Sequence, residues 1–149
     1  MNKFITLILA LFILQGCSYE PILTKKNYDF QFINIIYEGD KNINEEIEKN
    51  LKNIKQGTLK YDIYFRTIQN KEIISSDSKG DPKIYKINVQ VEYKVSNNDK
   101  TILENSINKQ FTYNNISDKH ELSKYEEDLL KNLSDSISDE ILFSLKVLK

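Results

Sequence analysis

The sequence predicts an α+β fold: a two-layer sandwich in β-α-β-β-β-α order, with a mostly antiparallel four-stranded sheet and two helices on one of its faces. Lys83–Ser96 alternates apolar and polar side chains along its whole length, the pattern of a strand with one buried face. Asn42–Ile54 and Asp118–Val147 instead repeat apolar residues about every four positions, the pattern of amphipathic helices. One-sided strands and one-sided helices bury their apolar sides against each other, which gives two layers.

Composition points to one globular domain and excludes a nucleic-acid binder. The chain has 149 residues, of which 29% are charged and 40% hydrophobic, the balance of a chain that can bury a core. Its net charge is −1 and its pI is near 5.9, so it carries no basic footprint for nucleic acid. A single cysteine excludes an internal disulfide.

The N-terminus has the pattern of a secretory signal. Lys3 supplies a positive charge, and Phe4–Leu14 is apolar except for Thr6. A membrane-spanning helix needs roughly 20 apolar residues. This run is about half that length, which is typical of a signal-peptide h-region.

The end of that run, Leu14-Gln15-Gly16-Cys17, resembles the bacterial lipobox. The resemblance implies a covalent diacylglycerol and an N-acyl chain on Cys17, and we expect no other cofactor. It divides the chain into a signal peptide at 1–16, a lipidated tether at 17–27 and one domain at 28–149. Ser18, in place of the aspartate that retains many lipoproteins in the inner membrane, favours the outer membrane.

The first strand is predicted at Tyr28–Tyr37, "YDFQFINIIY", because aromatic and β-branched residues dominate it. Strict alternation would place four of its residues on one face: Tyr28, Phe30, Phe32 and Asn34.

The first helix is predicted at Asn42–Ile54. Its apolar stripe consists of Ile43, Ile47, Leu51 and Ile54. Asn42 with Glu45 three residues later predicts a capping box at its start, and Gly57 predicts its end.

A second strand is predicted at Thr58–Arg66, where alternation resumes. Its phase changes near Ile68, which predicts a bulge, after which "EIISS" continues the strand. The polar run "SDSKGDP" predicts a loop.

Two further strands form a predicted hairpin. The alternating Lys83–Ser96 leads into "NNDK", a turn signal, and Thr101–Tyr113 returns beside it. The returning strand places four apolar residues in phase: Leu103, Ile107, Phe111 and Tyr113.

The second helix, Asp118–Val147, is predicted to be long enough to cross a whole sheet, and Asp118 with Glu121 predicts a capping box. Its stripe consists of Leu122, Tyr125, Leu129, Leu133, Ile137, Ile141 and Leu145.

Catalytic and metal-binding motifs are missing from the sequence. It contains no Gly-rich phosphate loop, G-x-S-x-G or H-E-x-x-H, and lipidation of Cys17 would leave no free thiol. His120, the one histidine, is expected to be exposed or to lie at a helix cap. We therefore predict that the protein is not an enzyme and holds no metal.

Lysines are the strongest candidates for binding a ligand. Lys79, Lys83 and Lys86 cluster around one sheet edge and its loop, and Lys124 lies near the start of the long helix. Such cations suit a phosphorylated ligand, but they also keep a sheet edge solvated and unpaired. The sequence leaves both readings open.

The order of these motifs resembles the LPS-assembly lipoprotein family (LptE) over nearly the whole chain. The matching stretches are Gly16-Cys17-Ser18-Tyr19-Glu20-Pro21-Ile22, Tyr61-Asp62-Ile63, "SDSKGD", "YKINVQVEYKV", "FTYNN" and "KYEEDLLKNL".

The resemblance implies a lipoprotein anchored to the periplasmic side of the cell outer membrane. Its partners would be the large outer-membrane β-barrel that inserts lipopolysaccharide, which it would plug and help to assemble, and lipopolysaccharide itself. The candidate lipopolysaccharide contacts are Lys79, Lys83, Lys86 and Lys124.

Two other functions share these features. Auxiliary lipoproteins of lipid-transport ABC systems also begin with a Gly-Cys lipobox and carry small α+β domains. A lipid-anchored inhibitor or structural protein is the third possibility.

Overall fold

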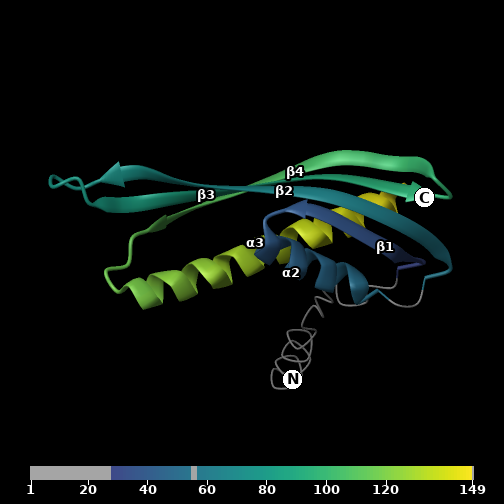
Figure 1. Ribbon diagram of the computed structural model, residues 1–149, viewed down its shortest axis with the longest axis horizontal. Coiled ribbons are helices and arrows are strands. Elements are labelled where there is room, and N and C mark those ends of the chain that lie inside the picture. The colour runs from purple at the N-terminus through teal and green to yellow at the C-terminus, as the bar shows by residue number, and fades with distance from the viewer. Residues whose placement is uncertain (1–27, 55–56, 149) are drawn as a thin grey trace, which may run out of the picture.

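The computed structural model describes residues 28–54 and 57–148 and confirms the predicted fold. Four strands and two helices follow one another in β-α-β-β-β-α order. Figure 1 shows two layers, with the sheet on one side and both helices on the other. The signal peptide, Cys17 and the tether at 17–27 lie outside the described residues.

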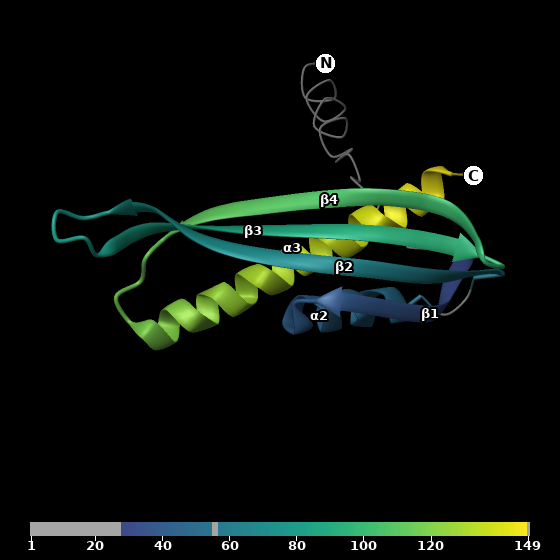
Figure 2. The ribbon, with the colours of Figure 1, turned by 45° about the horizontal axis from the view of Figure 1, so that its top comes forward.

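The sheet has the order β1-β2-β3-β4 and is antiparallel except at one edge. Its strands are β1 (Phe30–Gly39), β2 (Leu59–Ser76), β3 (Pro82–Asn97) and β4 (Lys100–Asn114). β1 runs parallel to β2 because helix α2 (Lys41–Lys52) carries the chain back between them. β2 and β3, then β3 and β4, pair as antiparallel hairpins (Figure 2).

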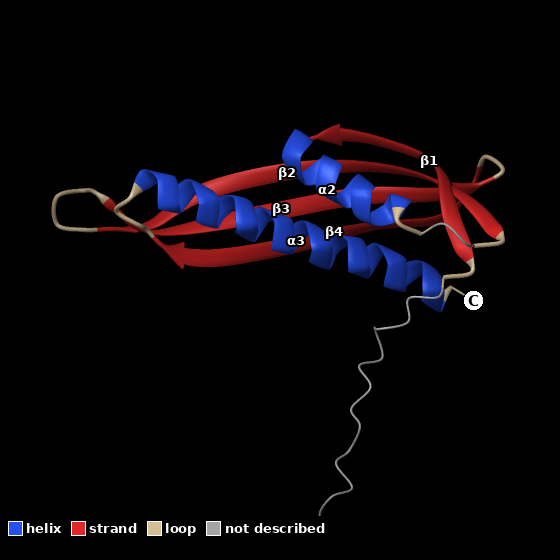
Figure 3. Ribbon diagram, turned by 90° about the horizontal axis from the view of Figure 1, so that it is seen from below, coloured by secondary structure: helices blue, strands red, loops and turns tan. Residues whose placement is uncertain are grey.

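The core lies between the sheet and the helices. Odd-numbered residues of β3 face the helices, and Val89, Val91 and Val95 are fully buried there. Helix α3 (Lys119–Val147) crosses beneath the sheet for most of its length, and α2 packs beside it (Figure 3). At 29 residues, α3 is about 44 Å long.

The predicted face of Asn34 is wrong, because a bulge in β1 turns this residue to the other side of the sheet. The pairing of β1 with β2 shifts between Phe32 and Asn34, so one residue is skipped. Asn34 therefore points away from the helices, where its Nδ2 donates to Asp62 Oδ1 at 2.7 Å. After the bulge, Ile35 and Tyr37 pack against the core in its place.

Helix α2 starts earlier than predicted, so the capping box at Asn42 and Glu45 is wrong. Asp40 is the N-cap, and its Oδ1 accepts from the backbone N–H of Ile43 at 3.1 Å. The predicted apolar stripe is confirmed: Ile43, Ile47 and Leu51 are buried, and Ile54 packs against the core.

Gly57 does not end this helix, because α2 stops at Lys52 with Asn53 as its C-cap. A Cβ on Gly57 would lie 2.0 Å from the carbonyl carbon of Phe30. The glycine instead lets the chain pass close to the start of β1.

The bulge predicted near Ile68 is also misplaced. β2 pairs with β3 without interruption from Asp62 to Ile73 and shifts register only between Ile73 and Ser76. The apparent change of phase arises because Thr67, a polar residue, occupies the buried face, while Ile68 lies on the open one.

The predicted turn between β3 and β4 is confirmed. Asn98 and Asp99 take positive φ values of 47° and 62°, which suit the tight turn of a two-residue hairpin.

The cap of α3 is confirmed, and so is its apolar stripe except at Tyr125. Asp118 is the N-cap and accepts from the backbone N–H of His120 and of Glu121. Five residues of the stripe are buried and Leu133 packs against the core; the five are Leu122, Leu129, Ile137, Ile141 and Leu145. Tyr125 is 39% exposed, and the small Ser134 and Ser138 are buried beside the stripe.

Candidate functional site

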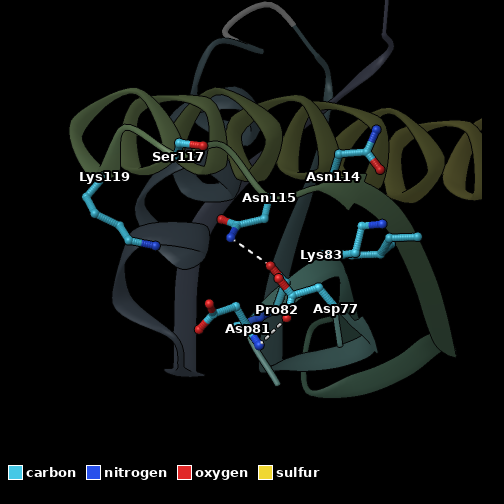
Figure 4. A pocket seen from close by; sticks show the side chains of 9 residues that line it. Asp77, Asp81, Pro82, Lys83, Asn114, Asn115, Ser117 and Lys119 are labelled. Atoms are coloured by element: carbon cyan, nitrogen blue, oxygen red, sulfur yellow. Dashed lines mark hydrogen bonds between the residues drawn. The ribbon is translucent and has the colours of Figure 1, made fainter. Parts of the chain in front are cut away.

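A cleft of about 640 Å³ lies at the end of the molecule where the β2–β3 hairpin, the end of β4 and the start of α3 meet (Figure 4). Its lining residues are Asp77, Asp81, Pro82, Lys83, Ile84, Asn114, Asn115, Ser117 and Lys119.

The hairpin loop beside the cleft is held by its own hydrogen bonds. The Oδ1 atom of Asp77 accepts from the backbone N–H of Lys79 at 2.8 Å and of Asp81 at 2.9 Å. Gly80 takes a φ of 90°, which only glycine adopts without strain. The predicted loop is thus confirmed, and one wall of the cleft is preorganised.

Asn115 joins the hairpin to the chain that leaves β4. Its backbone N–H donates to the Lys83 carbonyl at 2.7 Å, and its Nδ2 donates to the Pro82 carbonyl at 2.8 Å. Its Oδ1 is buried and has no partner among the described residues. The amide therefore ties the end of β4 to the start of β3 and forms part of the cleft wall.

Cations flank this amide. In Figure 4, Lys83 and Lys119 lie on opposite sides of Asn115. The carboxylates of Asp77 and Asp81 also line the cleft, but that of Asp77 is engaged by the loop. Ammonium, carboxylate and amide groups together suit a ligand with both phosphate and hydroxyl groups.

The structure brings only part of the predicted lysine group together. Lys83 lines the cleft, and Lys79 lies on the adjoining loop. Lys86 lies on the open face of the sheet, where its Nζ is 2.9 Å from Glu72 Oε2. Lys124 is exposed on α3, outside the cleft lining.

Lys119 was missed by the sequence interpretation. Its one signal was its place next to Asp118, the predicted cap of a helix. That helix reaches the hairpin only because Ile84 of β3 pairs with Asn114 of β4, and this register is not readable from local periodicity.

A partly buried cluster of hydrogen-bonded side chains begins at Tyr113, the residue before Asn114 of the cleft lining. The hydroxyl of Tyr113 donates to Glu126 Oε1 at 2.6 Å, and Lys71 pairs with the same oxygen. Burial, followed by the hydrogen bond and the charge of Glu126, raises the pKa of the Tyr113 hydroxyl well above its ordinary value. The cluster joins β2, β4 and α3.

The open face of the sheet is a second, mostly polar surface. Paired rows cross it, including Asn70–Asn88–Gln110. Toward β1 it becomes apolar, where Ile36 is 62% and Tyr64 38% exposed. The sheet face that the helices leave open is therefore polar at its centre and apolar at the edge formed by β1.

Within residues 28–54 and 57–148, no group of histidine, cysteine, aspartate and glutamate is arranged to hold a metal ion. None of the helices described there combines the length and apolarity that a membrane crossing requires. His120 is exposed beside the cap of α3, the position expected for it.

Comparison with known proteins finds one matching family. The model of the LptE family, described as lipopolysaccharide-assembly, matches residues 37–145. No curated protein matches the sequence.

Several solved structures share the fold. Rare lipoprotein B from Shewanella oneidensis is 17% identical with a TM-score of 0.60, over 78% of this chain and 94% of the other. Lipoprotein B from Nitrosomonas europaea is 14% identical with a TM-score of 0.56, over 79% and 85%. A minor lipoprotein from Acinetobacter baumannii is 8% identical with a TM-score of 0.56, over 78% and 89%.

Proposed function

The chain belongs to the LptE lipopolysaccharide-assembly family, and from this membership we propose that it plugs and helps to assemble the outer-membrane β-barrel that inserts lipopolysaccharide. The family match over residues 37–145 carries the proposal. We further propose that the protein binds lipopolysaccharide during transport, is anchored by lipid on Cys17 to the periplasmic side of the outer membrane, and is not an enzyme.

The shape and polarity of the domain support the proposal that it fills the lumen of a β-barrel. The interior of an outer-membrane barrel is polar, and large barrels leave a wide lumen. The polar rows on the open face of the sheet suit such a wall, and the apolar edge at Ile36 and Tyr64 offers a drier contact.

Copurification tests the barrel partnership. The tagged full chain is extracted in mild detergent, and proteins recovered in near-equal amount are identified. We expect one large outer-membrane β-barrel. Recovery of an inner-membrane transporter would contradict the proposal and favour an auxiliary ABC lipoprotein, and the absence of a stoichiometric partner would also contradict it.

The cleft supports the lipopolysaccharide contact. Lys83 and Lys119, which both line the cleft, would pair with phosphate. Lys79 would contribute from the rim of the cleft. Lys86 and Lys124 lie outside it, so we propose no direct contact for them.

Charge reversal in the cleft tests this contact. Losing a charge-assisted hydrogen bond costs about 1.5–3 kcal/mol, so Lys83→Glu with Lys119→Glu should weaken binding on the order of ten- to a hundredfold. The measurement is titration of the purified protein with lipopolysaccharide. The matched control is Lys60→Glu with Lys124→Glu, which changes the net charge equally at exposed sites outside the cleft. Equal losses in the two variants would contradict the cleft as the site.

A further inference from the structure

The last two turns of α3 are apolar on both sides of the helix. Ile141, Leu142 and Leu145 are buried toward the sheet. On the other side, Phe143 is 60% and Val147 67% exposed, one helical turn apart. Ser144 and Lys146 are the polar residues of this segment, and the described residues leave Phe143 and Val147 uncovered.

Charge changes along α3 at the same point. Acidic residues are frequent before it and end with Glu140, which pairs with Lys109. From Ile141 to the C-terminus the sequence "ILFSLKVLK" holds no acidic residue and two lysines. Leu148, which is 56% exposed, extends the apolar surface. We refer to Phe143, Val147 and Leu148 as the apolar tip.

The apolar tip lies at the end of the molecule where β1 begins. Figures 1 and 3 both show the end of α3 and the start of β1 at one end, and the β2–β3 hairpin at the other. The described chain therefore begins at the same end of the molecule as the apolar tip. The ten residues between Cys17 and Tyr28, 18–27, reach at most about 36 Å when fully extended.

We propose that the apolar tip is a membrane-contact surface, which enters the headgroup region of the phospholipid leaflet that holds the acyl chains of Cys17. The inference rests on the lipid anchor of the proposed function. Aromatic and aliphatic side chains flanked by lysine are the composition of interfacial helices, because the rings reach the acyl boundary while ammonium groups meet lipid phosphates.

Three side chains bind a membrane weakly by themselves, so the anchor is essential to the proposed contact. It holds the domain at a high local concentration beside the bilayer and makes the second contact intramolecular. The contact would fix the orientation of the domain relative to the membrane. β2 alone is 18 residues, or about 60 Å, long, so a domain resting on its apolar tip holds the cleft well away from the lipid.

Fluorescence quenching tests the contact with the chain as it exists. Cys17 is the only cysteine, and acylation consumes its thiol, so an introduced cysteine can be labelled alone. Phe143→Cys and Val147→Cys are labelled at the apolar tip. Ser78→Cys, on the hairpin loop, and Ser123→Cys, on the exposed side of the first turns of α3, are the controls.

The acylated proteins are incorporated into vesicles of phosphatidylethanolamine and phosphatidylglycerol with brominated acyl chains. We expect the labels at 143 and 147 to shift to the blue and to be quenched several-fold more strongly than those at 78 and 123. Adding Phe143→Asp to the Val147→Cys protein should remove most of the quenching at 147. Quenching at the tip equal to that of the controls overturns the inference.

Failure of this inference is separable from failure of the proposed function. The assay contains no barrel and no lipopolysaccharide, so its result does not depend on either partner. Flotation of the protein with the vesicles, together with the mass of the acylated N-terminus, tests the anchor independently. Anchored protein with an unquenched tip overturns the membrane contact alone, whereas unacylated protein that does not float overturns both the anchor and the contact.

Discussion

At the scale of single residues, one threonine holds the junction between β1 and α2. Thr67 is 2% exposed in the middle of β2. Its Oγ1 accepts from the backbone N–H of Asp40 at 2.9 Å and donates to Asn44 Oδ1 at 2.8 Å. Gly39, with a φ of 101°, lies against the Thr67 carbonyl, where a Cβ would come within 1.9 Å. The chain therefore turns into α2 around a buried polar contact.

Thr67→Val tests that contact. Valine has nearly the same shape as threonine and suits a strand. It would leave the backbone N–H of Asp40 and the side-chain oxygen Oδ1 of Asn44 without their partner. Each unsatisfied buried group costs about 1–3 kcal/mol, so we expect a loss of that order in the free energy of unfolding, measured with urea. Thr67→Ser keeps the hydroxyl and is the control. A valine variant as stable as the parent would contradict this role.

At the scale of elements, the long β2–β3 hairpin is held to α3 by the partly buried cluster around Glu126. Tyr113 and Lys71 both bind Glu126, and the Lys71 ammonium lies 4.4 Å from the centre of the Tyr85 ring. Tyr85 and Tyr113 stack at 5.6 Å. These contacts tie β2, β3 and β4 to α3.

Because the pKa of Tyr113 is raised in the folded protein, we expect the free energy of unfolding to fall at alkaline pH. The pKa of Tyr113 is raised in the folded protein by burial and by Glu126, while in the unfolded chain it is about 10. The unfolded chain therefore loses this proton first as pH rises. The contribution of Tyr113 is full below about pH 10 and decreases as pH rises toward the folded-state pKa.

Urea unfolding at a series of pH values measures that decrease. Tyr113→Phe cannot ionise and should make the fall in stability above about pH 10 shallower, although it also loses the hydrogen bond to Glu126 at lower pH. Tyr61→Phe, a tyrosine outside the cluster that contacts Phe30, is the control. The same alkaline slope in parent and Tyr113→Phe proteins would contradict the assignment.

At the scale of the whole molecule, the two proposed contacts lie at opposite ends. The cleft lies at the β2–β3 hairpin, and the apolar tip lies where β1 begins and α3 ends (Figure 1). The open sheet face runs between them and remains free for a partner in the described structure. One elongated sandwich can therefore touch lipid, a barrel wall and a phosphorylated ligand with three separate surfaces.

The elements, their order and the two-layer architecture follow from local patterns in the sequence. Alternation in Lys83–Ser96 and the stripes of both helices are local signals, because side-chain direction repeats every two residues in a strand and every 3.6 in a helix. The order of these elements together with the local motifs also pointed to the LptE family, which the family match confirms. The lipid on Cys17 stays a prediction from the sequence.

The contacts between distant residues follow from the folded arrangement and not from local patterns. The bulge at Ile33 turns Asn34 outward, Thr67 bonds to the Asp40 cap of α2, and the register of β3 with β4 places Lys83 and Lys119 on one cleft. The fold also leaves the apolar tip exposed at the end where β1 begins. These arrangements depend on contacts between residues far apart in the chain, and local periodicity carries no information about such distances.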